Sequence, residues 1–373
     1  MEYKCVDAGS RRCPCVLMEA GQCYMCTMSR TGKCGCGAEW EGACPYTEYV
    51  FNGLKTDGLL RPFRARVSEI VCYSEQLKVV RLAVPAGFAQ RCRVPGSYVL
   101  VESLGCIIRG YKGLYHTDYT NYVRTDGAKQ GGRIAILGGA GPMGIGSVEL
   151  ALGYAGVKQV IVTDLSQERL DFAAQKCSPE KAAQLGIDLR YVNTSGVEDP
   201  TKLLLEISEG GFDDVFVMVP VAALFTMAEA ICREDGCINF FAGPTVHDLP
   251  GSLNLYRVHY DGIHVVGTAG SIPEDMTDII KLIEEKKINP GALVSHILGL
   301  NAVSDTLFAM EKPSGAKKVC YNELDLPLIA IADLPELGKT DPMYKVLAQI
   351  VERNDGLWCG EAEEYLLAHA PRL

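Results

Sequence analysis

The chain has 373 residues, of which 48% are hydrophobic and 22% charged, and its formal net charge is −10 at pH 7. This length predicts two or three domains, and the acidic balance disfavours a broad basic surface for nucleic acid. The sequence has no run of about 18 apolar residues that would span a membrane, and its first residues lack the apolar core of a signal peptide. We therefore expect a cytoplasmic protein that acts on a small molecule, with assembly into a homo-oligomer left open.

Cysteine is concentrated in the first 50 residues. These residues have little apolar periodicity and need a cross-link, such as a bound metal or disulfides, to fold. Eight of the 16 cysteines lie in the first 44 residues. Their spacing brings thiolates together in pairs, which suits tetrahedral zinc, but iron–sulfur clusters use the same four thiolates. Disulfides would also account for these cysteines, as would a segment that holds no ligand. We predict that residues 1–50 form a metal-binding-like segment with Cys13, Cys15, Cys23, Cys26, Cys34, Cys36 and Cys44 as candidate ligands.

Residues 60–101 are predicted to form a partial β-barrel-like region. Three short runs with alternating apolar residues, at 64–71, 77–82 and 95–101, favour strands separated by turns. Together with Cys13-Pro-Cys15 and residues 44–49, these runs resemble the start of clostridial ferredoxin-reductase-like proteins, relatives of the dihydroorotate dehydrogenase electron-transfer subunit. The flavin-binding motif of that family does not follow residue 101, so we do not expect flavin.

Residues 102–325 alternate apolar strand runs with helical runs, which predicts an α/β fold with a doubly wound parallel Rossmann sheet. Helices are expected to begin near residues 143, 166, 201, 221 and 273. Two further helical runs, at 343–353 and 361–369, predict a helical C-terminal tail over residues 326–373. The expected strands are residues 133–137, 159–163, 188–192, 214–219, 237–242 and 264–267.

The junction at residues 133–144 predicts a dinucleotide site. A buried strand runs directly into Gly138-Gly-Ala-Gly-Pro-Met-Gly144, which places Gly139, Gly141 and Gly144 in the GxGxxG spacing. These glycines permit a tight turn, close approach of a pyrophosphate and close packing of the next helix. Asp164 follows the second strand, where a carboxylate accepts hydrogen bonds from the ribose hydroxyls and repels a 2′-phosphate. We therefore expect NAD in preference to NADP.

Several stretches of this domain resemble the medium-chain dehydrogenase/reductase superfamily, and within it the sorbitol dehydrogenase and L-sorbose-1-phosphate reductase group. The matching stretches include residues 132–144, 211–217, 236–244 and 264–268. The resemblance implies hydride transfer between nicotinamide and a polyol or sugar phosphate, and it makes His259 the candidate catalytic residue. The cofactor residues that it implies are Gly139, Gly141, Pro142, Met143, Gly144, Asp164, Val219, Ala242, Gly243 and Thr268.

The catalytic zinc domain that this family carries before its nucleotide-binding domain is not recognisable here. The first histidine is His116, and Glu102 alone matches a family zinc ligand. Two other functions therefore stay open: an inactive NAD-binding protein, and an electron-transfer module like the ferredoxin-reductase relatives.

Overall fold

The computed structural model describes residues 66–72, 78–83, 97–309 and 315–373. The chain divides into two compact units, Met1–Arg93 and Val94–Leu373. In the first unit, β1 (Arg66–Cys72) pairs antiparallel with β2 (Lys78–Ala83). This pair confirms two of the three strands expected before residue 101. The cysteines proposed as metal ligands lie outside the described residues.

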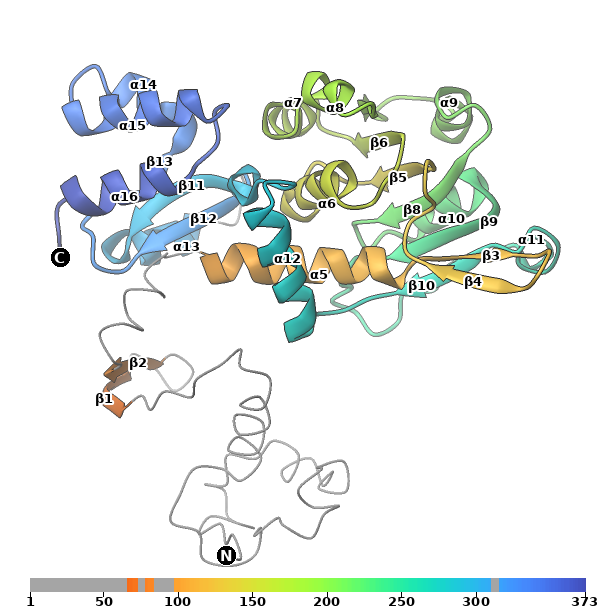
Figure 1. Cartoon of the computed structure of the whole chain (residues 1–373), viewed down its shortest axis with the longest axis horizontal. Helices are drawn as coiled ribbons and strands as arrows, with labels where there is room; N and C mark the ends of the chain where they lie inside the picture. The colour runs from red at the N-terminus through yellow and green to blue at the C-terminus, as the bar shows by residue number, and fades with distance from the viewer. Residues whose placement is uncertain (1–65, 73–77, 84–96, 310–314) are drawn as a thin grey trace, which may run out of the picture. The chain divides into compact units, whose positions relative to one another are not determined.

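The second unit is built on a six-stranded sheet in the order β10-β9-β8-β5-β6-β7, in which all neighbours are parallel (Figure 1). This is the doubly wound Rossmann sheet expected from the sequence. Two strands, β5 and β10, have the predicted bounds, and the other four differ at their ends. The strands are β5 (Arg133–Leu137), β6 (Gln159–Asp164), β7 (Asp188–Asn193), β8 (Phe212–Val217), β9 (Cys232–Phe240) and β10 (His264–Gly267).

Helices cover both faces of this sheet because alternate strand residues point to opposite sides. On one face, Ile134 and Ile136 of β5 join a core cluster with the first group of helices: α5 (Ser97–Gly113), α6 (Pro142–Gly153), α7 (Gln167–Lys176), α8 (Pro179–Gln184) and α12 (Pro273–Glu284). On the other face, Ala135 and Leu137 pack with α9 (Pro200–Ile207) and α10 (Ala222–Ile231).

The third strand expected before residue 101 is wrong for residues 97–101, which begin helix α5. Leu104, Ile107, Ile108 and Tyr111 are fully buried. They lie at positions i, i+3, i+4 and i+7, the spacing of one face of a helix. The aromatic and β-branched residues before them favour a strand locally, but burial of this helical face against α6 and α12 decides the structure. The domain boundary predicted at 101/102 falls inside this helix.

The C-terminal part adds a three-stranded sheet in the order β12-β11-β13, covered by helices (Figure 1). Leu347, Ile350 and Val351 are buried on one face of α15 (Pro342–Arg353), as their spacing predicts. In α16 (Gly360–His369) the spacing of Tyr365, Leu366 and Ala368 also predicts one packed face, but Ala368 is exposed. The strands are β11 (Val294–Gly299), β12 (Lys317–Tyr321) and β13 (Ile329–Ala330). The helices are α13 (Val303–Ala309), α14 (Leu334–Leu337), α15 (Pro342–Arg353) and α16 (Gly360–His369), with 3-10 turns at Pro290–Leu293, Leu300–Ala302 and Ile331–Asp333.

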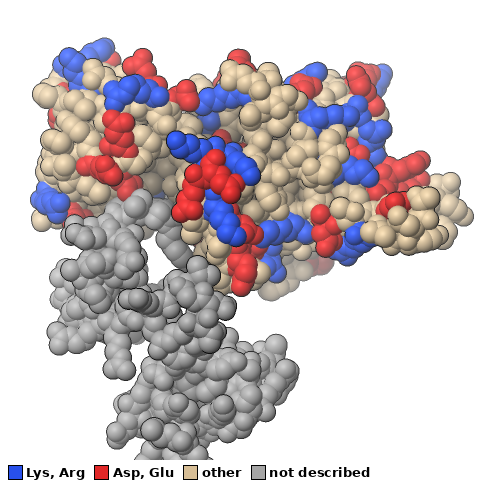
Figure 2. All heavy atoms as spheres, viewed as in Figure 1, with Lys and Arg blue, Asp and Glu red and all other residues tan. Residues whose placement is uncertain are grey.

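Two small elements lie at the amino ends of the parallel strands. The hairpin of β3 (Tyr115–Asp118) and β4 (Val123–Asp126) links α5 to the sheet, and α11 (Leu255–Tyr260) precedes β10. Figure 2 shows Lys and Arg interspersed with Asp and Glu over the face of the coloured residues that it draws. Among the described residues, no helix has the length and apolarity needed to cross a membrane.

Candidate functional site

The glycine loop between β5 and α6 lies at the carboxyl ends of the parallel strands, where ligands bind in open α/β sheets. Gly138 adopts φ +68°, and the backbone N–H of Gly139 donates to the carbonyl oxygen of Thr163 at 2.8 Å. Gly141 caps α6 without a side-chain hydrogen bond, and Pro142 follows it. The first amides of α6 are therefore left to an anionic ligand.

Gly144 sets how closely α6 approaches the loop. A Cβ at this position would lie 1.9 Å from the carbonyl oxygen of Gly139, closer than any side chain tolerates. A Cβ at Gly138 would lie 2.7 Å from Val219 Cγ2. The loop thus has its tight geometry because glycine occupies both positions, which fits the role expected for the glycine motif.

Asp164 ends β6 beside this loop and is only 9% exposed. Its Oδ1 accepts hydrogen bonds from the amides of Leu165 at 2.9 Å and Ser166 at 3.1 Å. Its Oδ2 has a guanidinium nitrogen of Arg169 at 3.7 Å and accepts no hydrogen bond from the described residues. One oxygen therefore fixes the turn, and the other remains available to a ribose hydroxyl.

The residues expected to line the nicotinamide half lie at the carboxyl ends of the next strands in the sheet order. Val219 and Ala242 follow β8 and β9, and the amide of Ala242 donates to the Val217 carbonyl at 3.0 Å. Thr268 follows β10, with its hydroxyl 3.5 Å from the fully buried amide group of Asn239. The fold therefore brings these residues to the same edge as the glycine loop.

A cavity of about 740 Å³ opens beside the first half of this edge. Ala140, Pro142 and Met143 line it from the loop, and Arg169 lines it from α7. Its opposite wall comes from β11, α13 and β12 and includes Lys317. Its volume lies in the range of small-molecule sites, about 300–1,000 Å³. The cavity thus adjoins the pyrophosphate and ribose positions of the predicted cofactor.

His259 lies away from this edge. It is exposed on α11, a six-residue helix with no buried residue. Arg257 of the same helix bonds the carbonyl oxygens of Glu229 and Cys232, at the amino end of β9, and its Nε donates to Asp261 Oδ2 at 2.8 Å. Arg257 therefore anchors α11 at the amino edge. Strands of four to nine residues separate the two edges by roughly 13–30 Å.

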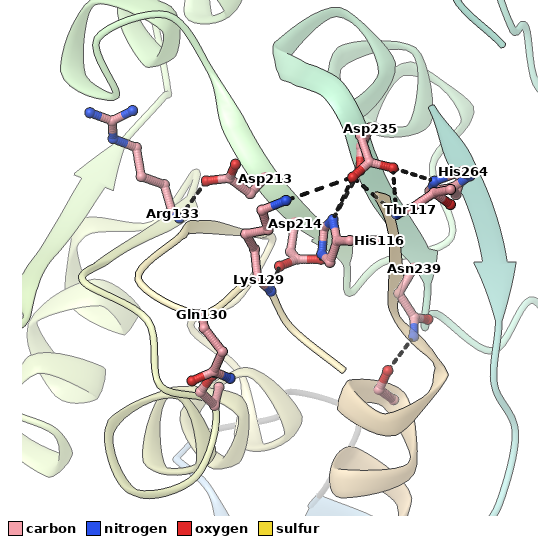
Figure 3. A network of polar contacts seen from close by, with 12 residues as sticks. His116, Thr117, Lys129, Gln130, Arg133, Asp213, Asp214, Asp235, Asn239 and His264 are labelled. Carbon is pink, nitrogen blue, oxygen red and sulfur yellow. Dashed lines mark hydrogen bonds and ion pairs between the residues drawn. The ribbon is translucent and has the colours of Figure 1, made fainter. Parts of the chain in front are cut away.

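A network of polar side chains occupies that amino edge (Figure 3). His116 Nε2 lies 3.1 Å from Asp214 Oδ1, and His116 Nδ1 lies 2.9 Å from the carbonyl oxygen of Asp235. The carboxylate of Asp235 also accepts from the Thr117 amide and lies 3.0 Å from His264 Nε2. Burial lowers the pKa of His116, but the hydrogen bond and charge of Asp214 outweigh it and raise that pKa above its ordinary value. Because this network is remote from the glycine loop, we assign it a structural role.

Of the candidate metal ligands, Glu102 alone lies in the described residues. It is half-buried on α5, where it accepts a hydrogen bond from Cys106 Sγ at 3.2 Å. Within residues 97–309 and 315–373, no group of three or more His, Cys, Asp or Glu side chains could hold a metal ion. The side chains of these two ranges therefore do not fit a catalytic zinc.

Sequence reasoning missed Arg169, whose guanidinium faces Asp164. Its position three residues after the helix-capping Ser166 places it in the first turn of α7, which returns toward the loop. The sequence does place Arg169 five residues after Asp164, in the first turn of the following helix, and this spacing could have identified it.

Comparisons with known proteins agree with this geometry. A family model described as "Zinc-binding dehydrogenase" matches residues 142–285. The mannitol-1-phosphate 5-dehydrogenase of Aliivibrio fischeri is 37% identical over 297 residues, which are 78% of this chain and 69% of that protein. The chain belongs to the medium-chain zinc-binding dehydrogenases. This family implies a nicotinamide dinucleotide as cofactor.

Two further relatives match a similar share of this chain. The uncharacterized protein YggP of Escherichia coli K12 is 44% identical over 285 residues, 74% of this chain and 67% of its own length. The L-sorbose 1-phosphate reductase of Klebsiella pneumoniae is 38% identical over 273 residues, 73% of this chain and 63% of its own length. The chain thus spans about two thirds of the length of these relatives. The ferredoxin-reductase resemblance of residues 1–101 has no support from these matches.

Proposed function

We propose that this chain binds NAD and transfers hydride between the nicotinamide and a CH–OH group of a polyol or sugar phosphate. The observation that carries the proposal is Oδ2 of Asp164 beside the glycine loop, which accepts no hydrogen bond from the described residues and has only the Arg169 guanidinium near it, at 3.7 Å. A carboxylate there suits the two ribose hydroxyls of NAD and repels the 2′-phosphate of NADP. The named activities of the mannitol-1-phosphate and sorbose-1-phosphate relatives support the substrate class.

The described residues supply binding and orientation. The first amides of α6 hold the pyrophosphate, with Gly139, Gly141 and Gly144 giving the room for it. Val219, Ala242, Gly243 and Thr268 orient the nicotinamide at the ends of β8, β9 and β10. The cofactor, when bound, supplies or accepts the hydride. The chain's contribution is to fix that ring at one face of the substrate.

We derive no step through zinc, because the described side chains do not fit such a site. The geometry also gives no support to His259 as a catalytic residue, since its helix is anchored at the amino edge of the sheet. Its role stays a prediction. The domain layout of residues 1–50, 60–101, 102–325 and 326–373 and the cytoplasmic location stay predictions as well.

The test uses the full chain purified without oxygen. Metal analysis and an absorption spectrum identify zinc, iron or neither, and calorimetry measures NADH binding. Turnover is followed with mannitol 1-phosphate and L-sorbose 1-phosphate. NADH binding with turnover supports the proposal. Binding without turnover, with either substrate and with zinc supplied, would instead identify a cofactor-binding protein. Bound iron with electron transfer from NADH would favour the electron-transfer module.

A further inference from the structure

A second cavity, of about 920 Å³, lies between α7 and the C-terminal helices. Its inner wall includes Lys176 at the end of α7 and Ser295 and His296 on β11. An ion pair of 2.7 Å between Lys181 and Asp355 closes it at one side, by joining α8 to the turn after α15. Phe172 borders both this cavity and the one beside the glycine loop. The proposed hydride transfer makes no use of this second cavity.

Lys176 is the unusual side chain of this wall. It is only 9% exposed, and it has no hydrogen bond or ion pair with a carboxylate among the described residues. Its ammonium group lies over the ring of Phe172, 5.5 Å from the ring centre. A buried cation is costly unless it is paired, so proteins rarely leave one without a counter-charge. Burial accordingly lowers the pKa of Lys176.

His296 stands on the same wall with one nitrogen held in place. Its Nδ1 lies 2.8 Å from the hydroxyl of Ser295, which accepts from the Ala316 amide at 2.8 Å. The Ser295 hydroxyl has its own hydrogen to donate, with Nδ1 of His296 and the Lys317 carbonyl oxygen at 3.2 Å as the two acceptors in reach. When the hydroxyl donates to Nδ1, the neutral ring carries its hydrogen on Nε2. The other ring nitrogen, Nε2, makes no hydrogen bond among the described residues. Burial, with the charges of Lys318 and Lys176, lowers the pKa of His296 and outweighs the carboxylate of Asp333, which acts to raise that pKa. The surroundings of both Lys176 and His296 therefore favour the binding of an anion.

The rim of the cavity carries charges of both signs. Lys339 pairs with Glu336 and Asp355 with Lys181, so neither neutralises the interior. Lys345 and Glu352 are exposed and have no ion pair among the described residues. Lys339, Lys345, Glu352 and Asp355 are all exposed, so water screens these rim charges more than it screens Lys176, a residue that is only 9% exposed. The wall of the cavity therefore holds the positive charge of Lys176 without an ion-paired carboxylate among the described residues.

We infer that this cavity binds a small molecule through a phosphate group, with the ammonium of Lys176 as its counter-charge and His296 Nε2 as a second contact. Lysine serves as a point charge for phosphate in many sites, and the volume is that of a small-molecule site rather than of a bare ion. This site is separate from the cofactor loop and does not depend on the proposed hydride transfer.

The experiment titrates inorganic phosphate, and separately a hexose phosphate, into the full chain by calorimetry, at constant ionic strength and with saturating NADH to occupy the α6 amides. The variant Lys176→Met removes the charge and keeps the length of the side chain, and Lys176→Arg keeps the charge. Lys202→Met, on the exposed face of α9, is the matched control. We expect saturable binding to the parent chain, weakened about tenfold or more in Lys176→Met, retained in Lys176→Arg and unchanged in Lys202→Met.

Thermal melting gives a second readout that does not rest on the variant's affinity alone. Phosphate should raise the melting temperature of the parent chain and not that of Lys176→Met. Without phosphate, Lys176→Met should melt at the same or a higher temperature, because a residue that is only 9% exposed then no longer carries a positive charge without a paired carboxylate. Three results would each overturn the inference. The parent chain and Lys176→Met bind phosphate equally, Lys202→Met loses as much phosphate affinity as Lys176→Met, or the parent chain shows no saturable binding.

Discussion

The guanidinium of Arg169 lies 3.7 Å from Oδ2 of Asp164, the oxygen that the turn after β6 leaves free. The two groups have opposite preferences for the adenosine ribose. A carboxylate accepts hydrogen bonds from both hydroxyls of NAD, whereas a guanidinium attracts the 2′-phosphate of NADP. Since Asp164 is 9% exposed and Arg169 is exposed, we expect the carboxylate to dominate in the parent chain.

The first prediction concerns the variant Asp164→Asn. The amide oxygen can still accept from the amides of Leu165 and Ser166, so the turn should persist. Removing the negative charge abolishes the repulsion of a 2′-phosphate and leaves Arg169 to attract it. We expect the ratio of NADPH to NADH affinity to rise about tenfold or more, as measured by calorimetry with both cofactors.

A double variant, Asp164→Asn with Arg169→Ala, is the control, and it should lose most of the gained NADPH affinity. If the parent chain binds NADPH as tightly as NADH, the role given to the Asp164 carboxylate is incorrect.

The second prediction is that Gly144→Ala weakens NADH binding at least about tenfold and destabilises the fold by about 1–3 kcal/mol. The added Cβ would lie 1.9 Å from the Gly139 carbonyl oxygen, so α6 must move away from the loop that it completes. Denaturant unfolding and calorimetry measure the two effects. Gly360→Ala is the matched control, because a Cβ there meets nothing within 4 Å. If Gly144→Ala lost stability but kept its NADH affinity, Gly144 would not be needed for cofactor binding.

The sequence predicted the parts of this fold that depend on local pattern. β5 and β10 have their predicted bounds, and the N-cap Ser166 begins α7 as expected. Helix α5 was missed as a whole: residues 97–101 favour a strand locally, and no helix was expected before residue 143. The helical spacing of its buried residues, Leu104 to Tyr111, was the available signal. Whether this segment forms a helix depends on its packing against α12, some 160 residues later, and no local pattern reveals that contact.

Contacts between distant residues were the part that could not be predicted. His116 and Asp214 are 98 positions apart and meet only because β3 lies against the amino end of β8 and β9. Lys176 is the last residue of an ordinary amphipathic helix, and only the fold shows that it lines the same cavity as His296 without a paired carboxylate. Such sites depend on the tertiary arrangement of side chains rather than on spacing.

The third prediction is that His116→Leu destabilises the chain by about 3 kcal/mol or more, because Oδ1 of the fully buried Asp214 loses its partner and only Oδ2 keeps one, the Lys129 amide. The double variant His116→Leu with Asp214→Leu should recover part of this loss, since it removes both charged groups. Chemical denaturation of the three variants measures the coupling. The exposed His247→Leu serves as the control, with an expected change within about 0.5 kcal/mol. Additive effects of the two single variants would contradict a paired role.

The last prediction concerns a buried carboxyl group of the C-terminal layer. Glu363 accepts a hydrogen bond from the Tyr321 hydroxyl at 2.9 Å, and the same hydroxyl accepts from Trp358 Nε1 at 2.9 Å. Burial raises the pKa of Glu363 from its ordinary value of 4.5 to about 7. Between these two values the folded chain keeps a proton that the unfolded chain has released. The contribution of Glu363 to the free energy of unfolding is therefore fully present below pH 4.5 and is lost as the pH rises toward 7.

Glu363→Gln keeps an acceptor for Tyr321 without a charge, so this pH-dependent loss should disappear in the variant. The free energy of unfolding of the variant, relative to the parent chain, should rise across this pH window by roughly 1–3 kcal/mol, because one pKa unit corresponds to about 1.4 kcal/mol. Urea unfolding at closely spaced pH values measures the difference. Glu352→Gln, at an exposed position of α15, should leave the curve parallel to that of the parent chain, because Glu352 does not contribute to the pKa of Glu363. Parallel curves for the parent chain and Glu363→Gln would show that the Glu363 carboxyl group does not titrate in this pH range. Burial beside Tyr321 would then not raise the pKa of Glu363 as expected.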